Sequence, residues 1–279
     1  ISLPKFKFMK ISVSNIAWGN EDYEKFYSLL EHENCQGVEL APSKIWKDIK
    51  DVKYNEVVKL KKTISNFKLE VVGFHSLLFG MPSLEIFRSN ETRTKTKNYL
   101  LRLIDICTDL GGSQLIFGSP KNRKTNKQKK EEIKKISKLF FTEIAEYCQK
   151  KGTYFCIEPL GSNETNYITS VEEAGKFVEN LNQPNFKLQI DTKALFFTRE
   201  DPKKIIRKYK NLLQHVHVSD EDLKEPGRGK NNHTKISESL KDIKYSKFLS
   251  IEMRRVIGDE ENSIKRSIKF LKKHYLQNL

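Results

Sequence analysis

Tyr154-Phe-Cys-Ile-Glu158 is the first of four short, largely apolar runs in the second half of this chain. The runs that follow it are Phe186-Lys-Leu-Gln-Ile-Asp191, Leu213-Gln-His-Val-His217 and Phe248-Leu-Ser-Ile-Glu252. Each run has the length and composition of a strand, and each ends in a side chain that can bind a metal ion. In a (β/α)8 barrel the carboxyl ends of the parallel strands meet at one rim, where active sites form. The runs therefore predict such a barrel with a divalent-cation site at this rim.

The alternation of strand and helix extends along the whole chain. Hydrophobic period and turn signals predict strands at 10–14, 37–40, 69–75, 114–117, 154–158, 186–191, 213–217 and 248–252. The same signals predict helices near 21–33, 55–66, 92–110, 129–150, 236–243 and 262–274, and two more that begin after 170 and 201. No G-x-G-x-x-G follows any of these strands, which disfavours a doubly wound sheet. We therefore expect an α/β fold, a single (β/α)8 TIM barrel over 1–279, with 1–8 as an N-terminal extension.

Length and composition agree with this fold. The chain has 279 residues, and a barrel of this type typically needs about 250. Its 37% hydrophobic and 31% charged residues are typical of a globular protein with a solvated exterior. No apolar run approaches the roughly 18 residues that cross a bilayer, and the first residues lack the apolar segment of a secretory signal. Because the four cysteines show no CxxC spacing, we expect reduced thiols in a cytoplasmic protein without a membrane partner.

The net charge of +15 raises the question of a nucleic-acid partner. The excess is mostly lysine and is spread over every predicted helix face. The densest cluster, at 121–130, has the composition of a solvated loop that leads into a helix. Since such a spread also arises from a general compositional bias, we do not expect nucleic-acid binding, and assembly into a homo-oligomer stays open.

Seven short stretches of the chain form recognisable motifs: Ser14-Asn-Ile-Ala-Trp18, Gly37-Val-Glu-Leu-Ala-Pro42, Ile157-Glu158-Pro159, Ile190-Asp191-Thr192, His215-Val-His-Val-Ser-Asp220, Pro226-Gly-Arg-Gly229 and Ser250-Ile-Glu252. These motifs resemble those of the xylose-isomerase-like sugar isomerases and epimerases, among them the ketose 3-epimerases. They span nearly the whole chain in the family's order. The resemblance implies the barrel fold independently of the hydrophobic pattern.

The resemblance also implies one divalent metal ion, Mn²⁺, Mg²⁺, Co²⁺ or Zn²⁺, held at the ends of four strands. Carried over by position, its ligands are Glu158, Asp191, His217 and Glu252. His217 is preferred to His215 because the family's ligand histidine is followed by x-(Ser/Lys)-Asp, and Val218-Ser219-Asp220 follows His217.

The implied chemistry assigns a second role to two of these ligands. Removing a proton next to a carbonyl creates an enediolate, whose charge a metal ion stabilises as a Lewis acid. One carboxylate removes the proton and a second returns it, and the resemblance assigns these roles to Glu158 and Glu252. The expected activity is that of a carbohydrate isomerase or epimerase acting on a small polyhydroxy carbonyl compound.

The substrate is less defined, because the chain departs from the family at two positions. Ala194 stands where the family often has a histidine that touches substrate, and Leu223 lies near where an arginine is common. Cationic residues lie elsewhere at the rim and favour an anionic substrate, although ordinary solvated charges would give the same pattern. The residues expected to contact substrate are His75, Trp18, Lys121, Arg123, Arg228 and Arg254, with Lys193 as a further rim cation.

Other interpretations stay open. A metal-dependent dehydratase would use the same four ligands. An apurinic-site endonuclease shares the barrel and would suit the basic surface, but the three-metal site that its resemblance implies lacks a histidine within 114–119 and at Ala194. A non-catalytic barrel is disfavoured by the intact set of ligands. Strand alternation does not decide where Glu39 points, and His233 lies where a second metal would need further ligands.

Overall fold

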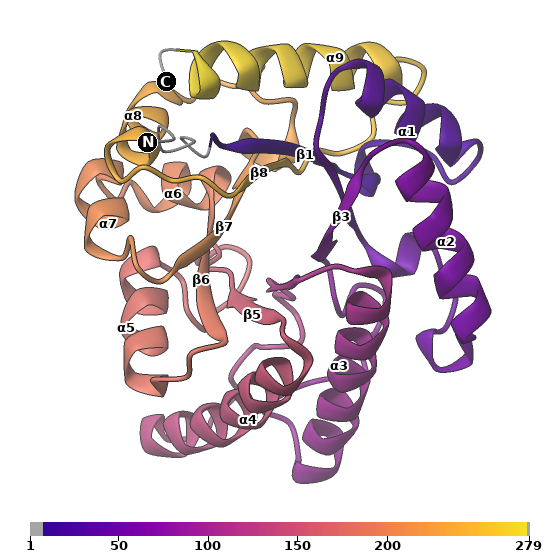
Figure 1. Ribbon diagram of the computed structural model, residues 1–279. Coiled ribbons are helices and arrows are strands. Elements are labelled where there is room, and N and C mark those ends of the chain that lie inside the picture. Colours follow the sequence, from indigo (N-terminus) through magenta and orange to yellow (C-terminus); the bar gives the residue numbers. More distant parts are fainter. Residues whose placement is uncertain (1–7, 278–279) are drawn as a thin grey trace, which may run out of the picture.

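Eight parallel strands close into a barrel in the computed structural model, which describes residues 8–277 of the chain (Figure 1). The strands are β1 (Lys10–Ser14), β2 (Gly37–Leu40), β3 (Glu70–Phe74), β4 (Gln114–Phe117), β5 (Tyr154–Ile157), β6 (Phe186–Asp191), β7 (Leu213–Val218) and β8 (Phe248–Ile251). Each strand pairs with the next one in the sequence, and β8 closes the barrel by pairing with β1. The predicted eight-stranded barrel is thereby confirmed. Most of the expected extension, residues 1–7, lies outside the described residues.

Helices surround the barrel and connect each strand to the next (Figure 1). Their bounds are α1 (Tyr23–His32), α2 (Tyr54–Asn66), α3 (Asn90–Leu110), α4 (Lys130–Lys151), α5 (Val171–Leu181), α6 (Thr192–Thr198), α7 (Pro202–Lys208), α8 (Thr234–Asp242) and α9 (Glu260–Leu271). A π-helical turn, Lys272–Leu276, follows α9. Among the residues that the structure describes, no helix combines the length and apolarity that a membrane span requires.

Local sequence signals set the ends of several helices. The hydroxyl of Ser89 accepts a hydrogen bond from the backbone N–H of Thr92 at the start of α3, and Ser170 caps α5 in the same way. Gly111 and Gly152 end α3 and α4 with φ of 91° and 72°, a left-handed backbone that glycine adopts without steric cost.

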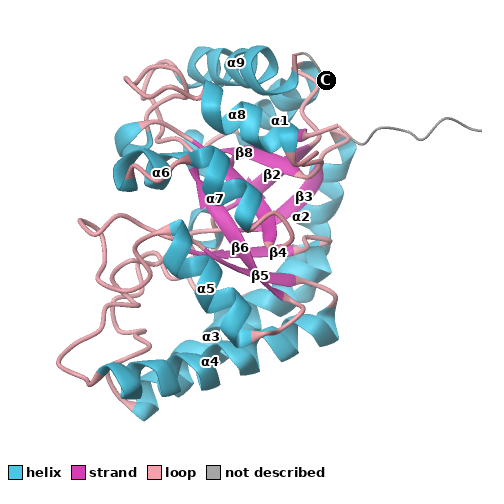
Figure 2. Ribbon diagram, turned by 90° about the vertical axis from the view of Figure 1, so that its left-hand side faces the viewer, coloured by secondary structure: helices cyan, strands magenta, loops and turns pink. Residues whose placement is uncertain are grey.

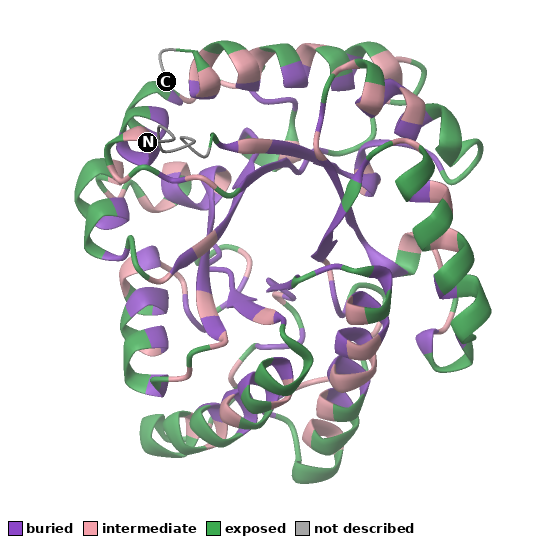
Figure 3. Cartoon of the chain, in the orientation of Figure 1, coloured by how far each residue is buried: buried purple, intermediate pink, exposed green. Residues whose placement is uncertain are grey.

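The barrel wall is buried, whereas the outer faces of the helices are exposed (Figure 3). Aromatic rings fill the space between the barrel and α4, where Phe141 packs against Phe117, Phe155 and Phe186. Burial of such rings away from water is a major favourable contribution to folding.

The longer loops follow the carboxyl ends of the strands and gather at one end of the barrel (Figure 2). They connect β3 to α3, β4 to α4, β5 to α5 and β7 to α8. Since the strands are short, the side chains at their carboxyl ends lie at the floor of the space between these loops. The fold thus positions any site at this end.

Candidate active site

The predicted metal ligands all lie at the carboxyl ends of neighbouring strands. Asp191 ends β6 and pairs in register with His217 of β7, and Glu158 and Glu252 directly follow β5 and β8. Each of the four residues is less than a tenth exposed. Glu158, His217 and Glu252 each present one ligand-type atom within 4.8 Å of the others.

The two carboxylate oxygens of Asp191 differ in their hydrogen bonding. Its Oδ1 accepts hydrogen bonds from the backbone N–H of Lys193, at 2.9 Å, and from the hydroxyl of Ser219, at 3.1 Å. Its Oδ2 is buried and has no hydrogen-bond partner among the described residues, and the Lys193 ammonium lies 3.8 Å from it. A buried carboxylate oxygen without a donor is costly unless a cation approaches it.

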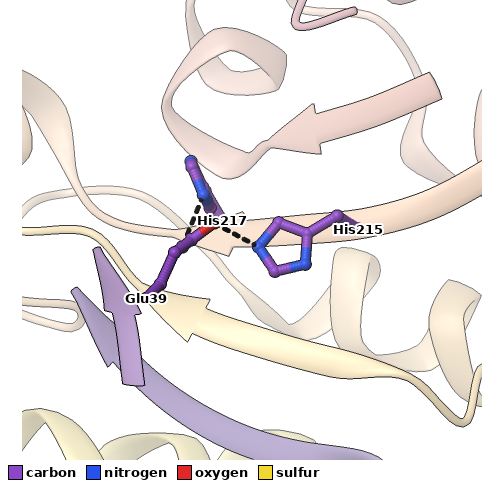
Figure 4. A group of neighbouring side chains, drawn as sticks. All are labelled: Glu39, His215 and His217. Atoms are coloured by element: carbon purple, nitrogen blue, oxygen red, sulfur yellow. Dashed lines mark hydrogen bonds and ion pairs between the residues drawn. The ribbon is translucent and has the colours of Figure 1, made fainter. Parts of the chain in front are cut away.

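His217 connects this group to the interior of the barrel. Its Nδ1 lies 3.1 Å from Oε2 of Glu252, on the side of the predicted ligands. Its Nε2 is hydrogen-bonded to Oε2 of Glu39 at 2.9 Å, and His215 Nε2 approaches the other oxygen of Glu39 to 3.2 Å (Figure 4). Glu39 therefore points into the barrel and is fully buried there.

His75 contacts one of the predicted catalytic residues. Its Nδ1 lies 3.0 Å from Oε1 of Glu252, and its Nε2 lies 2.6 Å from the hydroxyl of Ser14. Its ring is only 1% exposed, so these two contacts fix its orientation. His75 is therefore placed to orient Glu252. The sequence indicated its place at the rim but not this partner.

The two glutamates have opposite proton affinities in the absence of a bound ion. Burial, together with the nearby charges of Glu252 and Asp191, raises the pKa of Glu158 to about 8. Burial would also raise the pKa of Glu252, but the charge of His217 and contacts with His217 and His75 hold this pKa well below its usual value. Near neutral pH, one glutamate is therefore largely protonated and the other is ionised.

A cavity of about 600 Å³ leads from the loops to Glu158 and Glu252. Lys121, Lys193 and Glu164 supply its other charged groups, and the loop after β3 supplies an apolar wall that includes Leu78 and Met81. The Lys193 ammonium lies 3.3 Å from Oε1 of Glu164. Although burial lowers the pKa of Lys193, the charges of Asp191, Glu158 and Glu252 raise it above its usual value, so the side chain stays charged.

A second cavity, of about 480 Å³, shares Glu164, Lys193 and Leu223 with the first one. Arg254 and the half-exposed ring of Phe197 line it. Because they share these residues, the two cavities adjoin each other, and the charged Lys193 lies between them.

Arg123 does not occupy the place that the sequence analysis expected. Its side chain is fully buried, and it is not among the residues that line the cavity around the glutamates. Its guanidinium donates hydrogen bonds to the backbone carbonyls of Glu158, Ile168 and Phe117, at 2.7, 3.1 and 3.4 Å. A guanidinium presents several fixed donors, so Arg123 holds the loops together and is placed to support Glu158 from behind.

The other expected substrate contacts separate into two groups. Lys121 and His75 lie at the cavity or at its floor. Arg228 lines an open cleft of about 610 Å³ at the surface that includes neither Glu158 nor Glu252, and Arg254 lines both this cleft and the second cavity. Trp18 is buried and stacks on Phe26, with ring centroids 5.2 Å apart, beside a separate cavity next to α1 and α2.

Three further residues acquire a place that sequence reasoning did not give them. Glu39 contacts the predicted ligand His217, and Glu164 pairs with Lys193 in the cavity. His233 is hydrogen-bonded to the hydroxyl of Tyr275 at 2.7 Å, which indicates a structural role. Two signals marked Glu39, its charge in an otherwise apolar strand and its place in the Gly37–Pro42 motif, but neither indicated a partner three strands away around the barrel.

Comparison with known proteins shows which proteins this chain is similar to. The model of the family described as xylose isomerase-like TIM barrel matches residues 22–274. The chain is 30% identical to the D-psicose 3-epimerase of Ruminiclostridium cellulolyticum over 110 residues, which are 39% of this chain and 38% of that protein. It is 28% identical to the D-psicose 3-epimerase of Agrobacterium fabrum over 109 residues, again 39% and 38% of the two chains. These matches span less than half the length of either relative.

Solved structures share the fold over nearly the full chain. The apo structure of the 3-keto-D-glucoside 4-epimerase from E. coli has a TM-score of 0.81 at 17% identity, covering 95% of this chain and 99% of that one. The D-psicose 3-epimerase from Clostridium cellulolyticum, solved with D-tagatose, has a TM-score of 0.81 at 18% identity, with 96% and 99% covered. At this level of identity the likeness establishes a common architecture.

Proposed function

Because this chain belongs to the xylose isomerase-like TIM barrel family, we propose that it is a sugar or sugar-phosphate epimerase or isomerase that depends on one divalent metal ion. The observation that carries the proposal is the pair Glu158 and Glu252, two buried carboxyl groups that meet at the floor of one cavity. Two carboxyl groups that face one reacting carbon can divide proton removal and proton return between them.

The side chains at the site suit a divalent cation. The donor set of three carboxylates and one imidazole is typical of Mn²⁺, Mg²⁺, Co²⁺ or Zn²⁺. The unpartnered Oδ2 of Asp191 needs a positive neighbour beyond the distant ammonium of Lys193. Glu158, Asp191, His217 and Glu252 would hold the ion, and the ion would supply Lewis-acid stabilisation of an enediolate.

The two glutamates would move the proton. One of them would remove the proton from a carbon next to the carbonyl group, and the other would return a proton to the intermediate. Delivery to the opposite face of the same carbon inverts it, whereas delivery to the neighbouring carbon interconverts an aldose and a ketose. A positioned proton transfer of this kind contributes roughly 10²–10⁴-fold to the rate.

Substrate binding would depend on the two lysines of the cavity. Lys193 stays charged beside the predicted ligands, and Lys121 lies on the loop after β4. The presence of both cations, with Ala194 and Leu223 at positions where relatives often carry polar contacts, favours a polyhydroxy carbonyl compound with an anionic group. The neutral sugar D-psicose is the reference for this comparison, because it names the activity of the matching curated proteins.

The test uses metal-loaded protein and a panel of free and phosphorylated ketoses and aldoses in D₂O. We expect NMR to detect exchange of one C–H proton with solvent and formation of an epimer or isomer. Loss of a β-hydroxyl group would indicate a dehydratase on the same scaffold instead. If neutral sugars exchange and every phosphorylated analogue is inert, the anionic substrate is wrong while the reaction type stands.

The glutamate assignment has its own test. Glu158→Gln and Glu252→Gln should each reduce exchange at least 100-fold, at the lower bound of roughly 10²–10⁴ for a lost proton-transfer group. The exposed Glu146→Gln on α4 serves as the matched control and should exchange like the wild type. Near-normal turnover by either active-site variant would show that the proton-transfer assignment is wrong.

A further inference from the structure

We propose that Glu39 is a positioning residue that holds His217 with its Nδ1 turned toward the candidate metal site. The inference rests on the proposed function, because it requires His217 to be a ligand. It concerns a residue of β2 that reaches His217 of β7 from across the barrel, 178 positions away in the sequence.

The contacts of the imidazole determine its orientation. The Nε2 of His217 is hydrogen-bonded to Glu39 Oε2 at 2.9 Å, whereas its Nδ1 has no hydrogen-bond partner among the described residues. The side chains of His217 and Glu39 are completely buried, so bulk water does not compete for the ring nitrogens of His217. The carboxylate of Glu39 is an acceptor, and it therefore requires the proton of the ring on Nε2.

When the imidazole is neutral, as it is in a metal complex, the proton on Nε2 leaves Nδ1 with a lone pair. This nitrogen lies 3.1 Å from Oε2 of Glu252, which also carries lone pairs. Two such atoms repel each other at this distance unless a proton or a cation stands near both. A histidine that binds a metal commonly donates its other N–H to a carboxylate, which fixes the tautomer and increases the basicity of the ligating nitrogen. Glu39 meets this description with respect to His217.

A second histidine lies beside the other oxygen of Glu39. His215 lies two residues before His217 on the same strand, and its Nε2 approaches Glu39 Oε1 to 3.2 Å. The two rings are nearly perpendicular, at 85°, with centroids 5.0 Å apart. The carboxylate is thus placed between two imidazoles, one for each oxygen (Figure 4). An unpaired carboxylate would be costly to bury in this interior. A cation bound on the far side of His217 would supply the positive charge that explains why Glu39 stands there.

The experiment compares Zn²⁺ affinity by competition with a colorimetric chelator in wild type, Glu39→Gln and Gln189→Met. Glu39→Gln keeps the shape of the side chain but removes its charge and one acceptor. We expect it to bind Zn²⁺ roughly ten- to a hundredfold more weakly, the loss typical for partners of metal ligands. Gln189 is also a buried polar residue of the barrel interior, paired in register with His215. Gln189→Met controls for a general disturbance there and should bind like the wild type.

A second readout examines the tautomer directly and does not require any variant to fold. Long-range ¹H–¹⁵N NMR of the Zn²⁺-loaded wild type should show the proton of His217 on Nε2. A proton on Nδ1 would overturn the inference, as would unchanged Zn²⁺ affinity in a folded Glu39→Gln variant. Failure of the proposed function would look different, because His217→Ala would then bind Zn²⁺ as tightly as the wild type.

Discussion

Lys121 and Arg123 lie two residues apart on the loop after β4, and their surroundings give them different roles. Lys121 is exposed and lines the cavity, whereas Arg123 is buried and donates to three backbone carbonyls. Both are cations near a strand end, so residue type and spacing could not separate them. The two side chains leave the turn at 120–123 in different directions, Lys121 toward the cavity and Arg123 toward the backbone of the buried loops.

This difference predicts opposite phenotypes for two matched substitutions. Arg123→Met removes the donors of buried carbonyls and should lower the free energy of unfolding by about 3 kcal/mol, since each unsatisfied buried group costs about 1–3 kcal/mol. Lys121→Met should change it by less than about 0.5 kcal/mol, as is usual at the surface, but should weaken the binding of an anionic substrate. Urea unfolding and substrate titration measure the two effects. Equal destabilisation by both changes would contradict the assigned roles.

At the scale of the elements, strand ends were the most predictable feature of this chain. The predicted bounds of β1, β2, β4 and β6 coincide with those observed. The short helix α6 was not predicted, because Thr192–Thr198 follows β6 without any turn residue between them. Asp191 ends the strand and also caps this helix by accepting from the backbone N–H of Lys193. A single residue that ends one element, starts the next and faces the site leaves no separate signal for each role.

The loop after β7 depends in a similar way on one carboxylate. Asp220 is buried and accepts hydrogen bonds from the backbone N–H groups of Gly227 and Gly229, at 2.7 and 3.1 Å, and from the side chain of Asn231. Burial alone would raise its pKa, but His233 and these backbone donors hold the pKa below its usual value. The ionised form is therefore the one that the folded state stabilises.

The direction of this pKa shift predicts a pH dependence. The contribution of Asp220 is fully present above its unfolded pKa of about 3.9, and it is lost as the pH falls through the lower pKa of the folded state. Asp220→Asn should therefore cost about 1.5–3 kcal/mol of unfolding free energy at pH 7, the range for hydrogen bonds to a charged group. Urea unfolding should show this difference from wild type shrinking below pH 4. A difference that stays constant or grows on acidification would contradict the account.

At the scale of the whole molecule, barrel closure brings together residues that are distant in the sequence. The order of strands predicted that Glu158, Asp191, His217 and Glu252 would share one rim, because every strand of such a barrel runs in the same direction. The partners across the interior were not predictable in this way. Contacts such as Glu39 with His217 depend on barrel diameter and side-chain direction, and strand alternation does not encode either.

Because its proposed ligands come from four successive strands, a bound ion should stabilise the barrel as a whole. A metal concentration of 100 times Kd adds about 2.7 kcal/mol to the free energy of unfolding when only the folded state binds, and for a chain of this size each kcal/mol raises Tm by roughly 2–4 °C. We therefore expect Mn²⁺ or Co²⁺ to raise Tm by roughly 5–10 °C. Asp191→Ala should abolish this rise, since it removes one ligand, and elemental analysis should find about one ion per wild-type chain. About three ions per chain would instead favour the endonuclease type of site, and an unchanged Tm in wild type would contradict the proposed metal site itself.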